Sequence, residues 1–164
     1  MTTITPVLTN ENVKITVRLA KNIWTEHYTP IIGTAQVGYM LDKFQSAMAI
    51  ENQLKEGVLY YLLLHNEVPV GYFSFHLKEA HLFLSKLYVL STARGHGVGK
   101  KAMSFMESKA TQLGLAKIQL TVNKYNSIAI KAYEKMGFIN TAAVIQDIGN
   151  GHVMDDYILE KPIR

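Results

Sequence analysis

The sequence predicts a single α/β domain spanning residues 1–164, with elements in the order β-α-α-β-β-β-α-β-α-β-β. Three observations support this fold class. The length is typical of one domain with its own core, and 48% of residues are hydrophobic against 18% charged. Some segments carry apolar residues at helical spacing, whereas others are β-branched and aromatic runs of strand length. No internal repeat, low-complexity tract or linker divides the chain.

The first 57 residues predict a short strand followed by two helices. Ile4–Leu8 is the short apolar strand, and Thr9-Asn10 is a typical cap for the helix that follows. Pro30 is expected to end this first helix, and Gly33 to begin the second. The apolar positions at helical spacing are Val13, Val17, Ala20, Ile23 and Trp24 in the first helix, and Val37, Met40, Leu41, Phe44 and Met48 in the second.

Residues 58–90 predict three consecutive strands. Val58–Leu64 and Val68–His76 are rich in β-branched and aromatic residues, and the short polar segment between them predicts a hairpin. Leu82–Leu90 carries apolar residues on both faces, as expected of a strand in the middle of a sheet.

The second half of the chain predicts two helices and three strands. In chain order these are a helix from Val98 to Leu113, a strand Leu115–Val122, a helix Ser127–Met136 ended by Gly137, and a hairpin of Phe138–Ile148 with His152–Glu160 around Gly149-Asn150-Gly151. Because Leu82–Leu90 and Leu115–Val122 flank a helix, we expect them to be parallel neighbours joined by a right-handed crossover.

The composition argues against several classes of protein. The chain has no cysteine, so it offers no disulfide, thiolate nucleophile or cysteine-ligated metal. Its 17 Lys and Arg give a net charge of +4 but are scattered, unlike the basic stripe of a nucleic-acid-binding protein. The N-terminus lacks a signal-peptide pattern, and no apolar run approaches the ~20 residues of a membrane span. We therefore expect a cytoplasmic protein with no nucleic-acid or membrane partner.

A glycine-rich turn carries the strongest functional signal. The predicted strand ending at Leu90 leads into Arg94-Gly95-His96-Gly97-Val98-Gly99-Lys100, which opens a helix. Closely spaced glycines and the first amides of a helix are suited to binding a phosphate. Arg94 stands where a P-loop requires glycine, and Lys100 stands where the dinucleotide-binding pattern requires its third glycine. Both of those phosphate motifs are therefore excluded.

Two motifs resemble those of the GNAT superfamily of acyl-CoA-dependent N-acyltransferases. Arg94-x-x-Gly97-x-Gly99, after Leu87-Tyr88-Val89, is similar to the loop that binds the acyl-CoA pyrophosphate. The segment from Val122 to Phe138 resembles the second motif of that superfamily, and the order of elements agrees along essentially the whole chain. The N-terminal helices and the strand through Ser85 are most similar to bacterial polyamine acetyltransferases.

The resemblance implies a mixed, mostly antiparallel sheet of about seven strands with four helices, in which two central parallel strands splay apart. It also implies acetyl-CoA as co-substrate and no metal. Adjacent strand residues face opposite ways, so Asp155-Asp156 is not expected to bind a metal either. The residues expected to contact acetyl-CoA are Leu87, Tyr88, Val89, Arg94, Gly95, His96, Gly97, Val98, Gly99, Lys100, Asn123, Asn126 and Ala129. For Asn126, capping of the following helix is the alternative role.

Tyr133 is the expected catalytic residue. A phenol is protonated at neutral pH, so it can donate a proton to the departing CoA thiolate. Many relatives carry a general base on the third strand, but Leu82–Leu90 contains no carboxylate. A water chain or a group on another element must then accept the proton of the amine. The candidates on other elements are Glu26, His27, Glu79 and His81.

The sequence therefore predicts direct transfer of an acetyl group to a primary amine in a ternary complex. The acceptor is left open among polyamines, amino acids, peptides and other small amines, and so is assembly as a homodimer. The alternative function is a non-catalytic acyl-CoA-binding regulator of the same fold. The missing strand carboxylate favours the regulator, whereas Tyr133 favours the enzyme.

Overall fold

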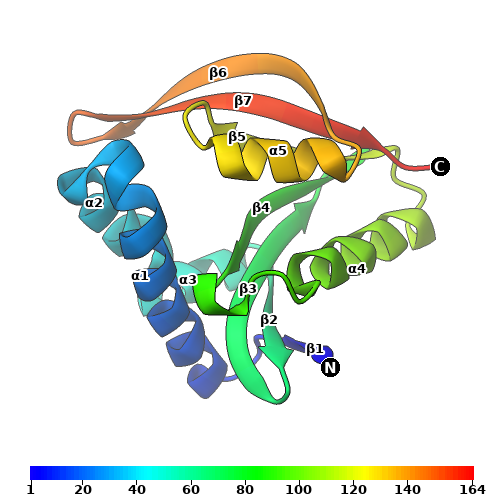
Figure 1. Cartoon of the computed structure of the whole chain (residues 1–164), viewed down its shortest axis with the longest axis horizontal. Coiled ribbons are helices and arrows are strands. Elements are labelled where there is room, and N and C mark those ends of the chain that lie inside the picture. Colours follow the sequence, from blue (N-terminus) through cyan, green and yellow to red (C-terminus); the bar gives the residue numbers. More distant parts are fainter.

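A computed structural model describes residues 1–164 and shows one seven-stranded sheet with helices on both faces (Figure 1). The strands are β1 (Thr2–Pro6), β2 (Leu59–His65), β3 (Val68–Leu77), β4 (His81–Val89), β5 (Lys117–Asn123), β6 (Ile139–Gly149) and β7 (His152–Pro162). The helices are α1 (Asn10–Ile32), α2 (Thr34–Gln45), α3 (Ala47–Lys55), α4 (Val98–Gln112) and α5 (Ser127–Lys135), with a 3₁₀ turn at Ser91–Ala93. The predicted fold class is confirmed.

The strand order is β1-β2-β3-β4-β5-β7-β6, so the predicted central strand is indeed the middle one. Every neighbouring pair is antiparallel except β4 and β5, which are parallel as expected from the helix between them. Both predicted hairpins form. The β2–β3 turn places Asn66 and Glu67 at positive φ, and the β6–β7 turn does the same for Asn150 and Gly151.

Two details of the helical segment differ from the prediction. The first helix continues past Pro30 to Ile32, because a proline in the last turn removes only one backbone hydrogen bond. It ends at Gly33, whose φ of 85° breaks the helical path. The predicted second helix is divided at Ser46, whose hydroxyl accepts a hydrogen bond from the Ala49 amide and starts α3. The chain thus has five α-helices rather than four.

The two faces of the sheet have separate cores. One core lies between the sheet and α4 and includes Phe73, Phe75 and Met106. The other lies between the sheet and α1–α3 and includes Trp24 and Tyr72. The helices α1–α3 lie to one side of β4 and α4 to the other (Figure 1). The alternation of Tyr72 and Phe73 therefore divides one strand between the two cores.

A β-bulge in β4 decides which side chains face each core. Ser74 pairs with Lys86 but Phe75 pairs with Leu84, so Ser85 is the extra residue. Leu84 and Leu87 consequently both pack on the α4 side, whereas Lys86 and Tyr88 line the α1 side. Without the bulge, Leu87 would face α1.

Next to the bulge the two central strands separate. The parallel pairing of β4 with β5 ends at Leu84 and Leu120. Beyond that point β4 keeps its bonds to β3, and β5 keeps its bonds to β7. The backbone edge of β4 that faces β5 is thus unpaired from Ser85 onward. This separation is the splay that the family resemblance implies.

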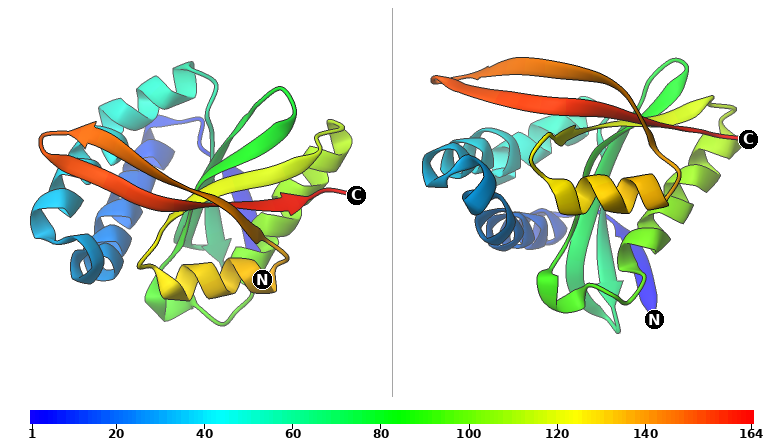
Figure 2. Two further views of the ribbon diagram at one scale, coloured as in Figure 1. Left: turned by 90° about the horizontal axis from the view of Figure 1, so that it is seen from above. Right: turned by 45° about the horizontal axis from the view of Figure 1, so that its top comes forward.

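The β6–β7 hairpin extends from the sheet over the end of α2 (Figure 2). Gln36 of α2 donates to the Val153 carbonyl at 2.8 Å, and the Tyr39 hydroxyl donates to the Ile148 carbonyl at 2.7 Å. These contacts close the α1 side of the splay with side chains from α2, β6 and β7. None of the helices α1–α5 combines the length and the hydropathy that a membrane-spanning helix needs.

Candidate active site

Two cavities meet at the splay between β4 and β5. The first has a volume of roughly 340 Å³ and lies toward α4 and α5. The second has a volume of roughly 530 Å³ and lies toward α1, α2 and the β6–β7 hairpin. The residues that line both cavities are Tyr28, Ser85, Lys86, Tyr88, Thr121 and Val122. A ligand in one cavity can therefore reach a ligand in the other through the gap in the sheet.

The glycine-rich turn forms one end of the first cavity. No backbone N–H from Gly95 to Lys100 donates a hydrogen bond within the chain, whereas the next amide, that of Lys101, donates to the Gly97 carbonyl. Gly97 caps the start of α4, where the helix dipole adds a positive potential. A run of free amides at a helix N-terminus is suited to a phosphate.

Glycine is needed in this turn for conformation. Gly95 has a φ of 83° and Gly97 a φ of 75°, in the left-handed region that other residues rarely adopt. A Cβ atom built at either residue would meet no other atom within 4 Å, so the turn is open to a ligand. Arg94 and Lys100 also line the cavity and add two positive charges.

Twelve of the fourteen residues predicted to form the site line the first cavity: Leu87, Tyr88, Val89, Arg94, Gly95, Gly97, Val98, Gly99, Lys100, Asn126, Ala129 and Tyr133. His96 does not line it. Its exposed ring stacks on that of His65, with centroids 4.9 Å apart. Asn123 lines the second cavity instead, and its side chain accepts a hydrogen bond from the Tyr125 amide.

Asn126 combines both roles considered for it. The side chain is 3% exposed, and its Oδ1 atom accepts the Ala129 amide at 3.4 Å as the cap of α5. The same oxygen lies 3.1 Å from Nε2 of His27, on α1. Capping and lining of the first cavity are therefore compatible in one residue.

Tyr133 lies on the side of α5 that faces the first cavity. The residue is half-buried, its ring packs on Phe138 with centroids 5.5 Å apart, and its hydroxyl makes no hydrogen bond within the chain. Burial of the phenol, with a smaller contribution from Tyr28, raises the pKa of Tyr133 well above its ordinary value of 10.0. The hydroxyl thus stays protonated at neutral pH and remains free to donate.

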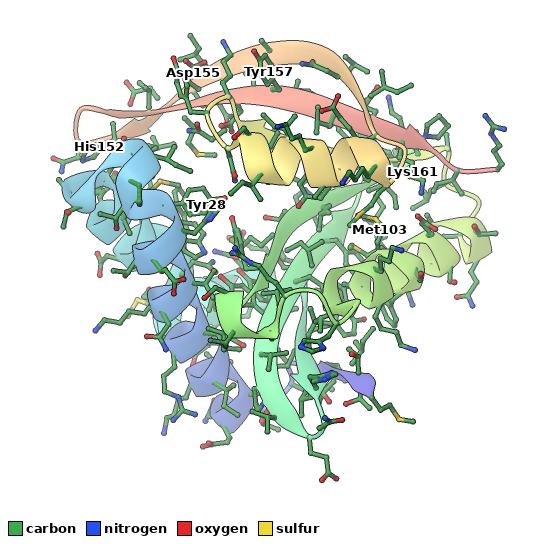
Figure 3. The ribbon with its side chains drawn as sticks, in the orientation of Figure 1. Tyr28, Met103, His152, Asp155, Tyr157 and Lys161 are labelled. Atoms are coloured by element: carbon green, nitrogen blue, oxygen red, sulfur yellow. The ribbon has the colours of Figure 1, made fainter.

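Aromatic rings form much of the wall of the second cavity. Trp24 and Tyr28 of α1 pack against Tyr88 of β4, with ring centroids 5.4 Å and 6.0 Å apart. The hydroxyls of Tyr28 and Tyr88 are 3.4 Å apart. Figure 3 shows Tyr28 on the inner side of α1, facing the middle of the molecule. Such a wall can attract the ammonium group of an amine through cation–π interactions.

Two ionisable groups of the second cavity have displaced pKa values. Asp156 of β7 is 4% exposed, and burial, together with repulsion from Asp155, raises the pKa of its carboxyl to about 6. Burial lowers the pKa of Lys86 to about 8. Its ammonium group donates to the Ser85 hydroxyl at 2.9 Å and has no acidic partner. Titratable groups displaced by burial in a cavity are typical of functional sites.

The sequence reasoning did not single out Asp156 as a candidate functional residue. That reasoning used strand alternation to separate Asp155 from Asp156 and stopped there. Pairing of Asn123 with Asp156 brings the carboxylate beside the splay, because directly opposed residues share one face of a sheet. The sequence of β7 offered no clear signal, because the face that carries Asp156 also carries His152 and Glu160.

None of the four general-base candidates named from the sequence lines the second cavity. Only His27 lines a cavity, the first one, and its ring is engaged with Asn126. Glu26 and Glu79 are exposed, and His81 lies at the far end of β4, where the strands are still paired. No three His, Asp or Glu side chains of the chain are grouped as metal ligands would be.

Comparison with known proteins identifies the family. A family model described as the acetyltransferase (GNAT) family matches residues 20–138. The uncharacterized N-acetyltransferase YycN of Bacillus subtilis is 30% identical over 91 residues, 53% of this chain and 58% of that protein. The D-amino-acid N-acetyltransferase HPA3 of Saccharomyces cerevisiae is 34% identical over 65 residues, 40% of each chain. The chain thus spans less than two thirds of both relatives.

A solved structure shows the same fold. PaiA N-acetyltransferase of Thermoplasma acidophilum, determined in complex with coenzyme A, superimposes with a TM-score of 0.81 over 99% of each chain at 19% identity. The match to the family model covers most of the sequence, including both motifs around the first cavity. The chain therefore belongs to the GNAT family of acetyltransferases.

Proposed function

We propose that this chain, acting as a single domain of residues 1–164, transfers an acetyl group from acetyl-CoA to a primary amine. The observation that carries the proposal is the free row of amides from Gly95 to Lys100, next to a gap in the sheet where a second cavity begins. One cavity suits a long phosphate-bearing molecule, and the other suits a small acceptor.

The first cavity offers partners for two parts of acetyl-CoA, the pyrophosphate and the pantetheine arm. The open turn and the positive charges of Arg94 and Lys100 suit the pyrophosphate. The unpaired edge of β4 from Leu87 to Val89 suits the pantetheine amides, which would bond to it as an added strand. The complex of the matched Thermoplasma protein with coenzyme A supports this choice of ligand.

In the proposed reaction the neutral amine nitrogen bonds to the carbonyl carbon of the acetyl thioester, and the carbon–sulfur bond breaks. The electron pair leaves with the sulfur, which takes a proton from the Tyr133 hydroxyl. As the amide forms, the attacking nitrogen loses one of its two protons to solvent, and Tyr133 regains a proton from solvent. No cysteine exists to form an acyl-enzyme, which supports direct transfer within a ternary complex.

The second cavity supports an enzyme rather than a regulator. A protein that only binds acyl-CoA needs no closed space beyond the splay, yet here a cavity of roughly 530 Å³ holds a buried carboxylate and aromatic rings. Both features suit a cationic amine. The name of the yeast relative, a D-amino-acid N-acetyltransferase, supports an amino-acid acceptor among the amines considered.

The proposal is tested by measuring thiol release from acetyl-CoA with a panel of amines. The panel holds spermidine, L- and D-phenylalanine, phenethylamine and a short peptide with a free N-terminus. We expect at least one amine to release thiol well above the rate of acetyl-CoA hydrolysis, with acetylated amine formed in equal amount. Tight acetyl-CoA binding without thiol release on any of them would favour the regulator.

A further inference from the structure

Asp156 is a buried carboxylate without a partner. The residue is 4% exposed and lines the second cavity. None of the ion pairs of the chain includes it, and no hydrogen bond reaches its side chain. Burial of an unpaired carboxylate is costly, and nearly all buried polar groups in proteins are paired. A ligand in the cavity is the natural source of the missing partner.

The charged groups around Asp156 do not compensate its negative charge. Asp155, next to it on β7, adds negative charge, and Tyr28 faces it from α1. Lys124, after β5, lowers the pKa of the Asp156 carboxyl, but its ammonium group is itself paired with Asp155 at 2.9 Å. Lys86 of β4 lines the same cavity but makes no ion pair with Asp156. The local field at Asp156 is thus not neutralised by the chain itself.

We infer that Asp156 binds the ammonium group of the acceptor and takes up its proton before the nitrogen attacks the thioester. The inference rests on the proposed function and names the proton acceptor of that same site. The N–H bond of the ammonium breaks, its electron pair stays on nitrogen, and the proton forms an O–H bond with the carboxylate. Asp156 then passes the proton to solvent.

The chemistry of the cavity favours this step. Two opposite charges in a buried site can neutralise each other by proton transfer, because burial disfavours the charged form of both groups. The aromatic wall of Trp24, Tyr28 and Tyr88 holds the ammonium next to the splay, where the thioester would arrive. Asp156 also supplies the carboxylate that β4 lacks, from a strand on the other side of β5.

The test is the pH dependence of kcat/KM for the amine of the panel that reacts fastest. If Asp156 is the proton acceptor, wild-type kcat/KM rises as the carboxyl ionises near pH 6 and is level from about pH 7.5 to 9. In Asp156→Asn the amine must lose its proton in solution, so kcat/KM falls by about 10²-fold at pH 7.5 and then rises tenfold per pH unit. Asp156→Glu restores part of the plateau.

Asp155→Asn is the matched control, since it changes the same side chain one position away on the opposite face of β7. It should keep the wild-type plateau, with the rise near pH 6 moved slightly lower because one negative neighbour is gone. All variants should bind coenzyme A like wild type by calorimetry. A wild-type rate that climbs steadily to pH 9, or an Asp156→Asn variant with the wild-type plateau, would overturn the inference.

A second readout separates this inference from the proposed function. If no amine of the panel reacts, acetyl transfer to these amines fails as a function, and amine binding decides the role of Asp156. Titration of phenethylamine into wild type and Asp156→Asn, each saturated with coenzyme A, should then show at least tenfold weaker binding in the variant. Equal affinity of the two proteins, or no binding to wild type, would refute ammonium recognition by Asp156.

Discussion

The two cavities that meet at the splay are built in different ways. In the first, the groups proposed to bind acetyl-CoA are largely backbone: free amides of the glycine-rich turn, the unpaired edge of β4 and the start of α4. The second is formed by side chains that α1, α2, β4, β5 and β7 bring together. A site made of backbone groups depends on the conformation of the chain, so many different sequences can form it. A side-chain site depends on which residues happen to meet, and it can select a particular acceptor.

The two cavities also differ in electrostatics. The first offers positive charges and amide dipoles to an anion, with a neutral phenol at the side of α5. The second contains a buried carboxylate and a half-buried lysine that have no ionic partners. Substitutions in the glycine-rich turn should therefore act on coenzyme A binding, and those at the ionisable groups of the second cavity on the amine.

The largest expected effect is on coenzyme A binding. Gly97→Asp places a side chain and a negative charge in the turn where the amides face a phosphate. We expect no measurable coenzyme A binding by calorimetry and no thermal protection by coenzyme A. Gly114→Asp is the control, because Gly114 also has a left-handed φ, of 67°, but lies beyond the other end of α4. A folded Gly97→Asp protein with wild-type affinity would remove the basis for the first cavity.

Replacement of Tyr133 by phenylalanine should act on turnover alone. The change removes one hydroxyl that has no partner in the chain, so stability and coenzyme A affinity should stay near wild type. Loss of a positioned acid is expected to lower kcat by roughly 10²–10⁴-fold. Tyr125→Phe is the control, since Tyr125 is 72% exposed and lines neither cavity. A kcat within a few-fold of wild type would mean that solvent protonates the thiolate.

A smaller effect is expected on the free energy of unfolding when Asp156 is replaced. The replacement should stabilise the fold, whereas replacement of a structural residue destabilises it. The pKa of Asp156 is raised to about 6 in the folded protein, so its contribution to stability is full below pH 4 and lost as pH rises through 6. Asp156→Asn removes the unpaired charge and should raise the free energy of unfolding by about 1–2 kcal/mol at pH 7.5. The gain should vanish near pH 4. Urea unfolding at both pH values measures it, and a destabilised variant at pH 7.5 would contradict the buried, unpaired state.

The same contrast explains what could be predicted from the sequence. The glycine-rich turn, Tyr133 and the helix cap at Asn126 are local features, readable because each depends on residues a few positions apart. The position of Asp156 in the site depends on the pairing of β7 with β5, which lies more than 30 residues away in the chain. This pairing continues beyond the point where β4 and β5 separate. No local pattern contains that information. For the same reason Asn123 was grouped with the first cavity, although it lines the second.

The helical errors have a similar cause. The end of the first helix was predicted from the local effect of Pro30 alone, and no break was predicted at Ser46. In the structure α1 ends at Gly33 and a further break falls at Ser46, where the buried Gln45 side chain hydrogen-bonds to Tyr60 and Tyr72 of the core between the sheet and α1–α3. Tertiary contacts thus set the path of α2 and α3. Because residues of both helices line the second cavity, these contacts also shape its wall.

Initial-rate kinetics test most directly whether the two cavities act as one site. The rate of thiol release is measured with acetyl-CoA and the best amine of the panel varied together, and with desulfo-CoA as an inhibitor. Both substrates must be present at the splay for direct transfer, so we predict intersecting double-reciprocal lines and inhibition that is competitive with acetyl-CoA but not with the amine. Parallel lines would mean that the acetyl group leaves coenzyme A before the amine binds, and would contradict a joint site.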